Sequence, residues 1–229
     1  MDDISDRIKV VTEKIAQEAR ASGREPSEIG LIAVSKSQPP EKVRVAFEAG
    51  QLVFGENRAQ ELLAKAPLLP SSARWHFIGH LQKNKIRKIL PVADLIHAVD
   101  SVELAEDINR IASELGLFPR VLLEVNVSGE SSKFGFSPDA VRRAAVRLLA
   151  LPRVQVEGLM TIAPIVERPD DARPFFAALR ILRDEIAAGH GTKLPTLSMG
   201  MSDDFGAAIR EGATLVRIGT AIFGARSTA

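Results

Sequence analysis

Eight short apolar runs, each followed by a segment with helical spacing, limit what this chain can fold into. The runs are Leu31–Val34, Leu52–Phe54, Trp75–Ile78, Leu95–Val99, Val121–Val127, Val154–Met160, Thr196–Met199 and Thr214–Ile218. Segments such as EKVRVAFEAG and SVELAEDINRIASELG separate them, and their apolar residues recur at helical intervals. Apolar runs without strict alternation are typical of strands covered on both faces, so the pattern favours a parallel sheet with right-handed crossovers.

Eight such units in 229 residues predict an α/β fold, a single (β/α)8 TIM-type barrel spanning residues 1–229. A further helix, around Ser5 to Ala21, precedes the first strand. An open doubly wound sheet is the alternative, but no GxGxxG motif follows the first strand to favour it. No long linker, low-complexity tract or internal repeat divides the chain.

Composition excludes several classes of protein. Lys and Arg total 30 against 29 Asp and Glu, so no overall basic field would hold nucleic acid or an anionic membrane. The absence of cysteine excludes disulfides and thiolate nucleophiles. No apolar stretch approaches the roughly 18 residues of a membrane span, and the start, MDDISDRIKVV, lacks the features of a signal peptide. We therefore expect a cytoplasmic protein.

Polar residues gather where the apolar runs end, and the interiors of the runs carry few of them. In a barrel of this type the chemistry lies at the C-terminal ends of the strands. Lys36 closes the first run, and a lysine there is costly to bury as a cation. Either its ammonium group snorkels to solvent, or Lys36 is a reactive amine held in a site.

Two motifs follow the seventh and eighth runs, SMGMSDDFGAAIREG and RIGTAIFG. We expect Gly200 in a tight turn, Ser202 as the N-cap of the next helix, and Gly219-Thr220 at a second helix start. These loops form the phosphate site of many such barrels. Ordinary turns explain each motif alone, but together they favour a phosphate pocket. A lysine and a phosphate pocket suggest pyridoxal 5'-phosphate (PLP), with a sugar phosphate as the rival.

The chain also resembles a known family over nearly its whole length. The motifs IAVSKSQP, FGENRAQE, WHFIGHLQKNK, VNVSGESSKFGF, GLMTIAP, LSMGMSDDFGAAIREGAT and VRIGTAIFGAR resemble those of the pyridoxal phosphate homeostasis proteins, which are related in fold to the N-terminal barrel of alanine racemase. The resemblance implies a cytosolic, monomeric barrel that carries or buffers PLP without dedicated turnover. PLP-dependent apo-enzymes are candidate recipients.

The resemblance assigns roles by position. It implies a Schiff base on Lys36, Asn57 near the ring, Arg217 beside the pyridine nitrogen, and phosphate binding by Ser202, Gly219 and Thr220. Met199 and Met201 are candidates for packing near the ring or phosphate, and His80, at a strand end, is a candidate for approaching the ligand. Phe134 departs from the family, which often has a small residue there.

The same residues bear on whether the protein is an enzyme. A cationic Arg217 at the pyridine nitrogen disfavours ring protonation and weakens the ring as an electron sink. Racemases of the related fold use two bases, a lysine and a tyrosine from a second domain, and this chain has no tyrosine. We therefore expect a binding protein, with a PLP-dependent amino-acid racemase-like enzyme as the alternative.

The histidines do not form a metal motif. His76 alternates to a side-facing position in its run and is expected to make a structural hydrogen bond. His97 and His190 are expected to be structural or exposed. We predict no metal site.

Overall fold

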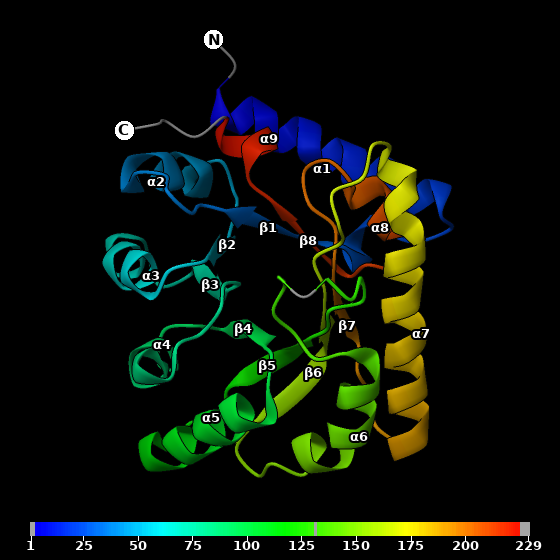
Figure 1. Cartoon of the computed structure of the whole chain (residues 1–229). Helices are drawn as coiled ribbons and strands as arrows, with labels where there is room; N and C mark the ends of the chain where they lie inside the picture. The colour runs from blue at the N-terminus through cyan, green and yellow to red at the C-terminus, as the bar shows by residue number, and fades with distance from the viewer. Residues whose placement is uncertain (1–2, 131, 225–229) are drawn as a thin grey trace.

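The computed structural model describes residues 3–130 and 132–224. Ser131, together with Ala225 and Arg226 of the last quoted motif, lies outside them. Eight parallel strands close into a barrel in chain order (Figure 1), which confirms the predicted (β/α)8 fold. They are β1 (Gly30–Val34), β2 (Val53–Glu56), β3 (Arg74–Phe77), β4 (Leu95–Val99), β5 (Arg120–Glu124), β6 (Gln155–Met160), β7 (Thr196–Ser198) and β8 (Leu215–Ile218).

Helices surround the barrel (Figure 1). They are α1 (Ile4–Ala21), α2 (Pro40–Glu48), α3 (Ala59–Lys65), α4 (Ile86–Ile89), α5 (Val102–Leu115), α6 (Pro138–Leu149), α7 (Arg173–His190), α8 (Phe205–Arg210) and α9 (Thr220–Phe223), with short 3-10 turns η1 (Pro26–Glu28), η2 (Ala66–Leu68), η3 (Lys83–Lys85) and η4 (Pro169–Ala172). Helix α5 shows why such segments fold locally. The Ser101 hydroxyl caps its start, and Gly116, in the left-handed region at φ 69°, ends it.

The strands carry more buried polar groups than the sequence pattern indicated. The prediction of nearly apolar strand interiors is wrong, because the strands bury Glu56, His76, His97, Glu124, Ser198 and Arg217. The main apolar core includes outward-facing strand residues and the inner faces of the helices, for example Phe54 and Ile108. A small second cluster includes Leu122 and Met160. Because the apolar strand residues belong to these two clusters, the other strand side chains inside the barrel are free to make polar contacts.

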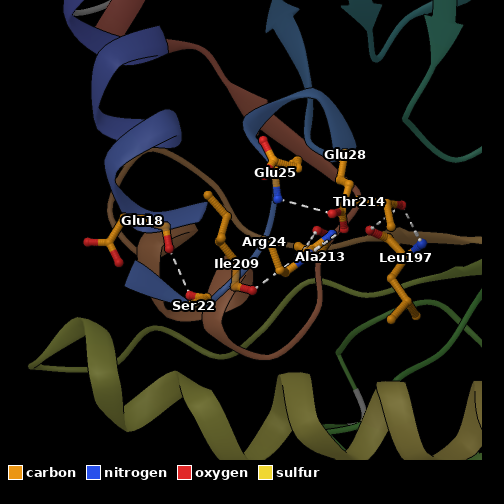
Figure 2. A network of polar contacts seen from close by, with 9 residues as sticks. All are labelled: Glu18, Ser22, Arg24, Glu25, Glu28, Leu197, Ile209, Ala213 and Thr214. Carbon is orange, nitrogen blue, oxygen red and sulfur yellow. Dashed lines mark hydrogen bonds and ion pairs between the residues drawn. The ribbon is translucent and has the colours of Figure 1, made fainter. Parts of the chain in front are cut away.

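One arginine fastens the N-terminal segment to the other end of the chain (Figure 2). Arg24 donates from Nη1 to the carbonyl oxygens of Ala213 at 2.7 Å and Ile209 at 3.3 Å, and from Nε to Glu28 at 3.1 Å. Beside it, the backbone N–H of Leu197 donates to the Thr214 hydroxyl at 2.9 Å. These contacts lie at the N-terminal ends of β7 and β8, the end of the barrel opposite the expected site.

Helix α1 lies across this closure and packs against α8 and α9 (Figure 1). It begins at Ile4, which agrees with the predicted extra helix. Among the described helices, none combines the length and the apolar character needed to cross a membrane.

Candidate functional site

A cavity of about 220 Å³ opens at the C-terminal ends of the strands. Its lining comes from segments far apart in the sequence, namely Val34, Lys36, Asn57, Ile78, Ile162, Met201, Ser202, Asp203, Arg217, Gly219 and Thr220. Seven residues singled out from the sequence thus line one cavity. They place an amine, a guanidinium, hydroxyls and the start of α9 around the same space.

Asn57 reaches this cavity because a glycine faces it. A Cβ atom at Gly79 would lie 2.3 Å from the Asn57 carbonyl oxygen. Any residue other than glycine would therefore clash with Asn57. The loop after β3 can therefore pass directly against the loop after β2. This close approach holds Asn57 at the edge of the cavity.

Two predicted residues lie elsewhere. Met199 is fully buried in the main apolar core and does not line the cavity. His80 lines a neighbouring cavity of about 360 Å³, which it shares with Asn57. Its Nδ1 atom lies 2.8 Å from Asp100 Oδ2, and its ring stacks on Phe134 with centroids 4.3 Å apart.

The predicted N-cap is wrong in detail. Helix α8 starts at Phe205, so its N-cap is Asp204, and the side chain of Asp204 makes no cap hydrogen bond. Its carboxylate instead accepts from the backbone N–H of Met201 at 2.6 Å. A turn therefore separates Ser202 from the helix, and Ser202 lies in the cavity wall.

Four polar residues, Ser35, Glu56, Glu61 and Lys65, hold both neighbours of Lys36, and we call them the Lys65 cluster. Glu61 is half-buried and the other three are buried. Lys65 Nζ donates to Glu56 at 2.7 Å, to the Ser35 carbonyl at 2.8 Å and to Glu61 at 2.9 Å. The Ser35 hydroxyl donates to Glu56 at 2.7 Å. The backbone N–H of Ser37 donates to Glu61 at 2.7 Å.

The cluster holds a strained turn. Ser37 has φ 59°, a left-handed conformation that costs a residue other than glycine or asparagine roughly 1–2 kcal/mol. The hydrogen bond from its N–H to Glu61 fixes that turn, and Ser35 is fixed on the other side. The backbone on both sides of Lys36 is thus anchored, which restricts where its amine can lie.

The Lys65 cluster is incompletely paired. Glu56 is fully buried, and its Oε2 atom has no hydrogen-bond partner in the described part of the chain. Burial raises the pKa of Glu56, against the opposing effect of Lys65 and Ser35. For Glu61 burial acts in the same direction, but the hydrogen bonds from Lys65 and Ser37 outweigh it and the pKa is lowered. The sequence analysis missed the cluster, although Glu56 adjoins Asn57 in the GEN motif.

Arg217 is held from inside the barrel. Its Nη1 atom donates to the Ser198 hydroxyl at 2.6 Å, and Nη2 donates to the Thr161 carbonyl at 2.8 Å. The chain of contacts continues from Ser198 to His97 Nδ1 at 2.9 Å, and from His97 Nε2 to His76 Nδ1 at 3.0 Å. The predicted structural hydrogen bond of His76 is confirmed, and His97 is structural.

A guanidinium is only a donor, so the Ser198 hydroxyl accepts from Arg217. One proton lies between Ser198 and His97 Nδ1, and one lies between His97 Nε2 and His76 Nδ1. Both rings are neutral in this arrangement, which agrees with burial lowering the pKa of His76 to about 3 and that of His97 well below its ordinary value.

Arg217 itself is almost fully buried, and burial lowers its pKa to about 10. Asp204 and Glu124 act in the opposite direction. The guanidinium therefore remains a cation at neutral pH, adjacent to the cavity that Lys36 lines.

A groove of about 630 Å³ lies between α1, η4 and α8. Within its lining, Arg210 forms ion pairs with both Glu18 and Asp170. No group of three or more metal-binding side chains occurs within residues 3–130 and 132–224.

Comparison with known proteins matches this architecture. The model of the family described as alanine racemase, N-terminal domain, matches residues 12–227. A pyridoxal phosphate homeostasis protein of Aquifex aeolicus is 45% identical over 222 residues, which cover 96% of this chain and 97% of that protein. A protein of the same name from Pseudomonas aeruginosa is 45% identical over 229 residues, covering 99% and 97%.

Solved structures agree. PipY of Synechococcus elongatus, in a structure with PLP bound, has a TM-score of 0.83 and 41% identity, covering 92% of this chain and 100% of that one. The alanine racemase of Corynebacterium glutamicum has a TM-score of 0.73 at 18% identity, covering 96% and 62%, which shows a shared fold alone. The chain belongs to the pyridoxal phosphate homeostasis proteins, within the family of the alanine racemase N-terminal domain.

Proposed function

We propose that this protein binds PLP at the mouth of its barrel, as a Schiff base on Lys36, and acts in PLP homeostasis without dedicated turnover. The observation that carries the proposal is the common cavity. Lys36, Arg217 and the phosphate-binding candidates Ser202, Gly219 and Thr220 all line it. The PLP in the PipY structure and the names of the relatives support the ligand.

The donor set fits such a ligand. The Ser202 and Thr220 hydroxyls and the first N–H groups of α9 suit a phosphate, because N–H groups at a helix start have no acceptor within the helix. The Lys36 amine suits an aldehyde, which the ligand supplies. The Lys65 cluster would hold the amine in place through the backbone on both sides of it.

The residues argue for binding rather than turnover. Arg217 is cationic and held by Ser198 and the Thr161 carbonyl, so a pyridine nitrogen beside it would stay unprotonated. The electron-sink chemistry that PLP can supply would then be weak. The chain also lacks the tyrosine that would serve as a second base. The proposal further holds that the protein is a monomer and that it releases PLP to PLP-dependent apo-enzymes.

The visible absorption spectrum of the purified protein tests the proposal. Wild type loaded with PLP should show a Schiff-base band that borohydride bleaches, leaving the ligand covalently fixed to Lys36. Lys36→Ala should lose both the band and the covalent product. Lys88→Ala, on the exposed face of α4, is the matched control and should behave as wild type. A wild type that stays colourless with PLP would overturn the proposal and favour a sugar phosphate.

A second candidate is a racemase-like enzyme, because the barrel shares its fold with alanine racemases. Proton exchange at the α-carbon of L-alanine in D2O, followed by NMR, separates the two functions. Sustained exchange that disappears in Lys36→Ala would favour the enzyme. Absence of exchange in protein that shows the Schiff-base band would favour the carrier.

A further inference from the structure

Lys36 lies in a tight turn that follows β1. The backbone N–H of Gln38 donates to the Ser35 carbonyl at 3.0 Å, so Lys36 is the second residue of a four-residue turn and Ser37 is the third. Ser37 has φ 59°, and among the described residues other than glycine it alone has a positive φ. A negative φ at the second residue and a positive φ at the third are the pattern of a type II turn.

The sequence of this turn does not favour that form. A type II turn prefers glycine or asparagine at its third residue, whereas serine is compatible with the commoner type I turn, in which the third residue has a negative φ. The two forms differ in the peptide group between Lys36 and Ser37, which points in opposite directions in them. A contact from outside the turn must therefore hold this peptide group in the observed direction.

Glu61 makes that contact. The N–H of Ser37 belongs to this peptide group, and it donates to Glu61 Oε2 at 2.7 Å. In a type I turn this N–H would point away from Glu61, and the hydrogen bond would be lost. Lys65 Nζ donates to the same oxygen at 2.9 Å and to the Ser35 carbonyl at 2.8 Å, so it fixes Glu61 relative to the first residue of the turn.

The form of the turn bears on the Lys36 side chain. The ψ angle of the second residue is about −30° in a type I turn and about +120° in a type II turn, and the rotamers open to a side chain depend on φ and ψ. The type II form therefore limits the directions in which the Lys36 amine can extend into the cavity that it shares with Arg217 and Thr220. Glu61 does not line this cavity, so its influence on Lys36 passes through the backbone of the turn.

We propose that Glu61, held in place by Lys65, is a positioning residue for Lys36. By keeping the turn in its type II form, Glu61 sets where the Lys36 amine meets the aldehyde of the ligand. Formation of the Schiff base, rather than binding of the phosphate, is the step that depends on it. The effect on the ligand rests on the proposed PLP function, whereas the form of the turn does not require PLP.

Spectroscopic titration with PLP tests the proposal. Glu61→Met removes the acceptor and should weaken formation of the Schiff-base band about fivefold or more, because the competent turn becomes a minor form. Glu61→Gln keeps an acceptor oxygen, and since both hydrogen bonds end on one oxygen, it should stay within about twofold of wild type. Glu48→Met, at an exposed position of α2, is the charge-matched control and should behave as wild type.

The third residue of the turn gives two further variants. Ser37→Val leaves Glu61 in place but disfavours a positive φ, so it should weaken the Schiff-base band as Glu61→Met does. Ser37→Gly, combined with Glu61→Met, should restore the wild-type response, since glycine adopts a positive φ without steric cost. If Glu61 served overall stability alone, that glycine would not repair its loss.

Two measurements separate the positioning of Lys36 from other effects. Pyridoxine 5'-phosphate lacks the aldehyde, and calorimetry should find the same affinity for it in wild type and Glu61→Met. NMR of isotope-labelled, ligand-free protein reports the turn itself. A strong nuclear Overhauser effect between the Lys36 Hα and the Ser37 N–H marks the type II form, and one between the two amide protons marks the type I form, which is expected in Glu61→Met.

Three results would overturn the proposal: an unchanged Schiff-base band or type II signal in Glu61→Met, no recovery with Ser37→Gly, or an equal loss of affinity for pyridoxine 5'-phosphate. Circular dichroism of each variant checks its fold. A wild type without a Schiff-base band would instead contradict the proposed function, and the NMR comparison would still decide whether Glu61 holds the turn.

Discussion

At the N-terminal end of the barrel, Arg24 satisfies two carbonyl oxygens and a carboxylate, and no buried polar atom there lacks a partner in the described chain. At the mouth, Glu56 has an oxygen without a partner in the described chain, burial raises the pKa of Glu124 to about 7, and Ser37 has a left-handed backbone. Strain and unpaired polar groups persist only where the surrounding structure overdetermines them. The comparison indicates that one end stabilises the fold, while the other gives up stability to prepare a site.

The largest effect on stability is expected at Lys65. Lys65→Met should lower the free energy of unfolding by about 3–5 kcal/mol, because it leaves buried Glu56 without its cation. Urea denaturation measures the loss. Lys88→Met, on exposed α4, should change stability by less than about 0.5 kcal/mol. A loss below 1 kcal/mol at Lys65 would mean that water already compensates the cluster.

The pH dependence of stability sharpens the comparison at Glu124. Its pKa is raised from 4.5 to about 7 in the folded protein, so folding is favoured while the group is protonated, and this contribution is lost as pH rises from 4.5 through 7. At about 1.4 kcal/mol per pH unit over this range, the free energy of unfolding changes by roughly 3.5 kcal/mol. Glu124→Gln should therefore be more stable than wild type at pH 8 and nearly equal at pH 4.5.

Thermal or urea unfolding of both proteins at the two pH values measures this effect, and Glu13→Gln controls for the loss of one charge. An equal difference at both pH values would show that Glu124 is ionised throughout. If Glu124→Gln were less stable than wild type at pH 8, the Glu124 carboxylate would stabilise the folded protein and would have a partner of its own.

A substitution at the N-terminal end of the barrel should lower stability without changing the cavity that Lys36 lines. Arg24→Met removes charge-assisted hydrogen bonds to Ala213 and Ile209 and should lower stability by about 2 kcal/mol. The Schiff-base band of the PLP-loaded protein should not shift. A changed band would mean that the two ends are coupled and that the comparison fails.

The smallest expected effect is at Ser37. Glycine relieves the left-handed backbone strain but adds entropy to the unfolded chain, so Ser37→Gly should raise stability by no more than about 1 kcal/mol. Ser22→Gly, outside the left-handed region at φ −95°, should lower stability instead. A loss at Ser37 would indicate that its side chain, rather than its backbone, holds the turn.

The sequence predicted the fold because eight apolar runs alternate with helical segments, and it brought Lys36, Arg217 and Thr220 to one end because parallel strands share that end. It did not predict Lys65 or Glu124. Lys65 lies on a helix where a lysine normally faces solvent, and Glu124 lies inside the apolar run Val121–Val127, where the spacing does not show which end of the strand it marks. Their roles arise from contacts between separate strands and helices, which spacing along the chain does not record. Met199 was misplaced because strand alternation points it toward the helices.

The closure of the barrel has a consequence for how the protein is made. Strand β1 pairs with β8 as well as with β2, and α1 packs against α8 and α9 as well as against α2, so the earliest elements to leave the ribosome find part of their partners only among the last. The apolar face of α1, which includes Ile8, Val11 and Ile15, is therefore only partly covered until α8 and α9 are synthesised. Contacts between distant segments also slow folding. Nascent chains of this protein are therefore expected to need a chaperone or protected surroundings until β8 emerges.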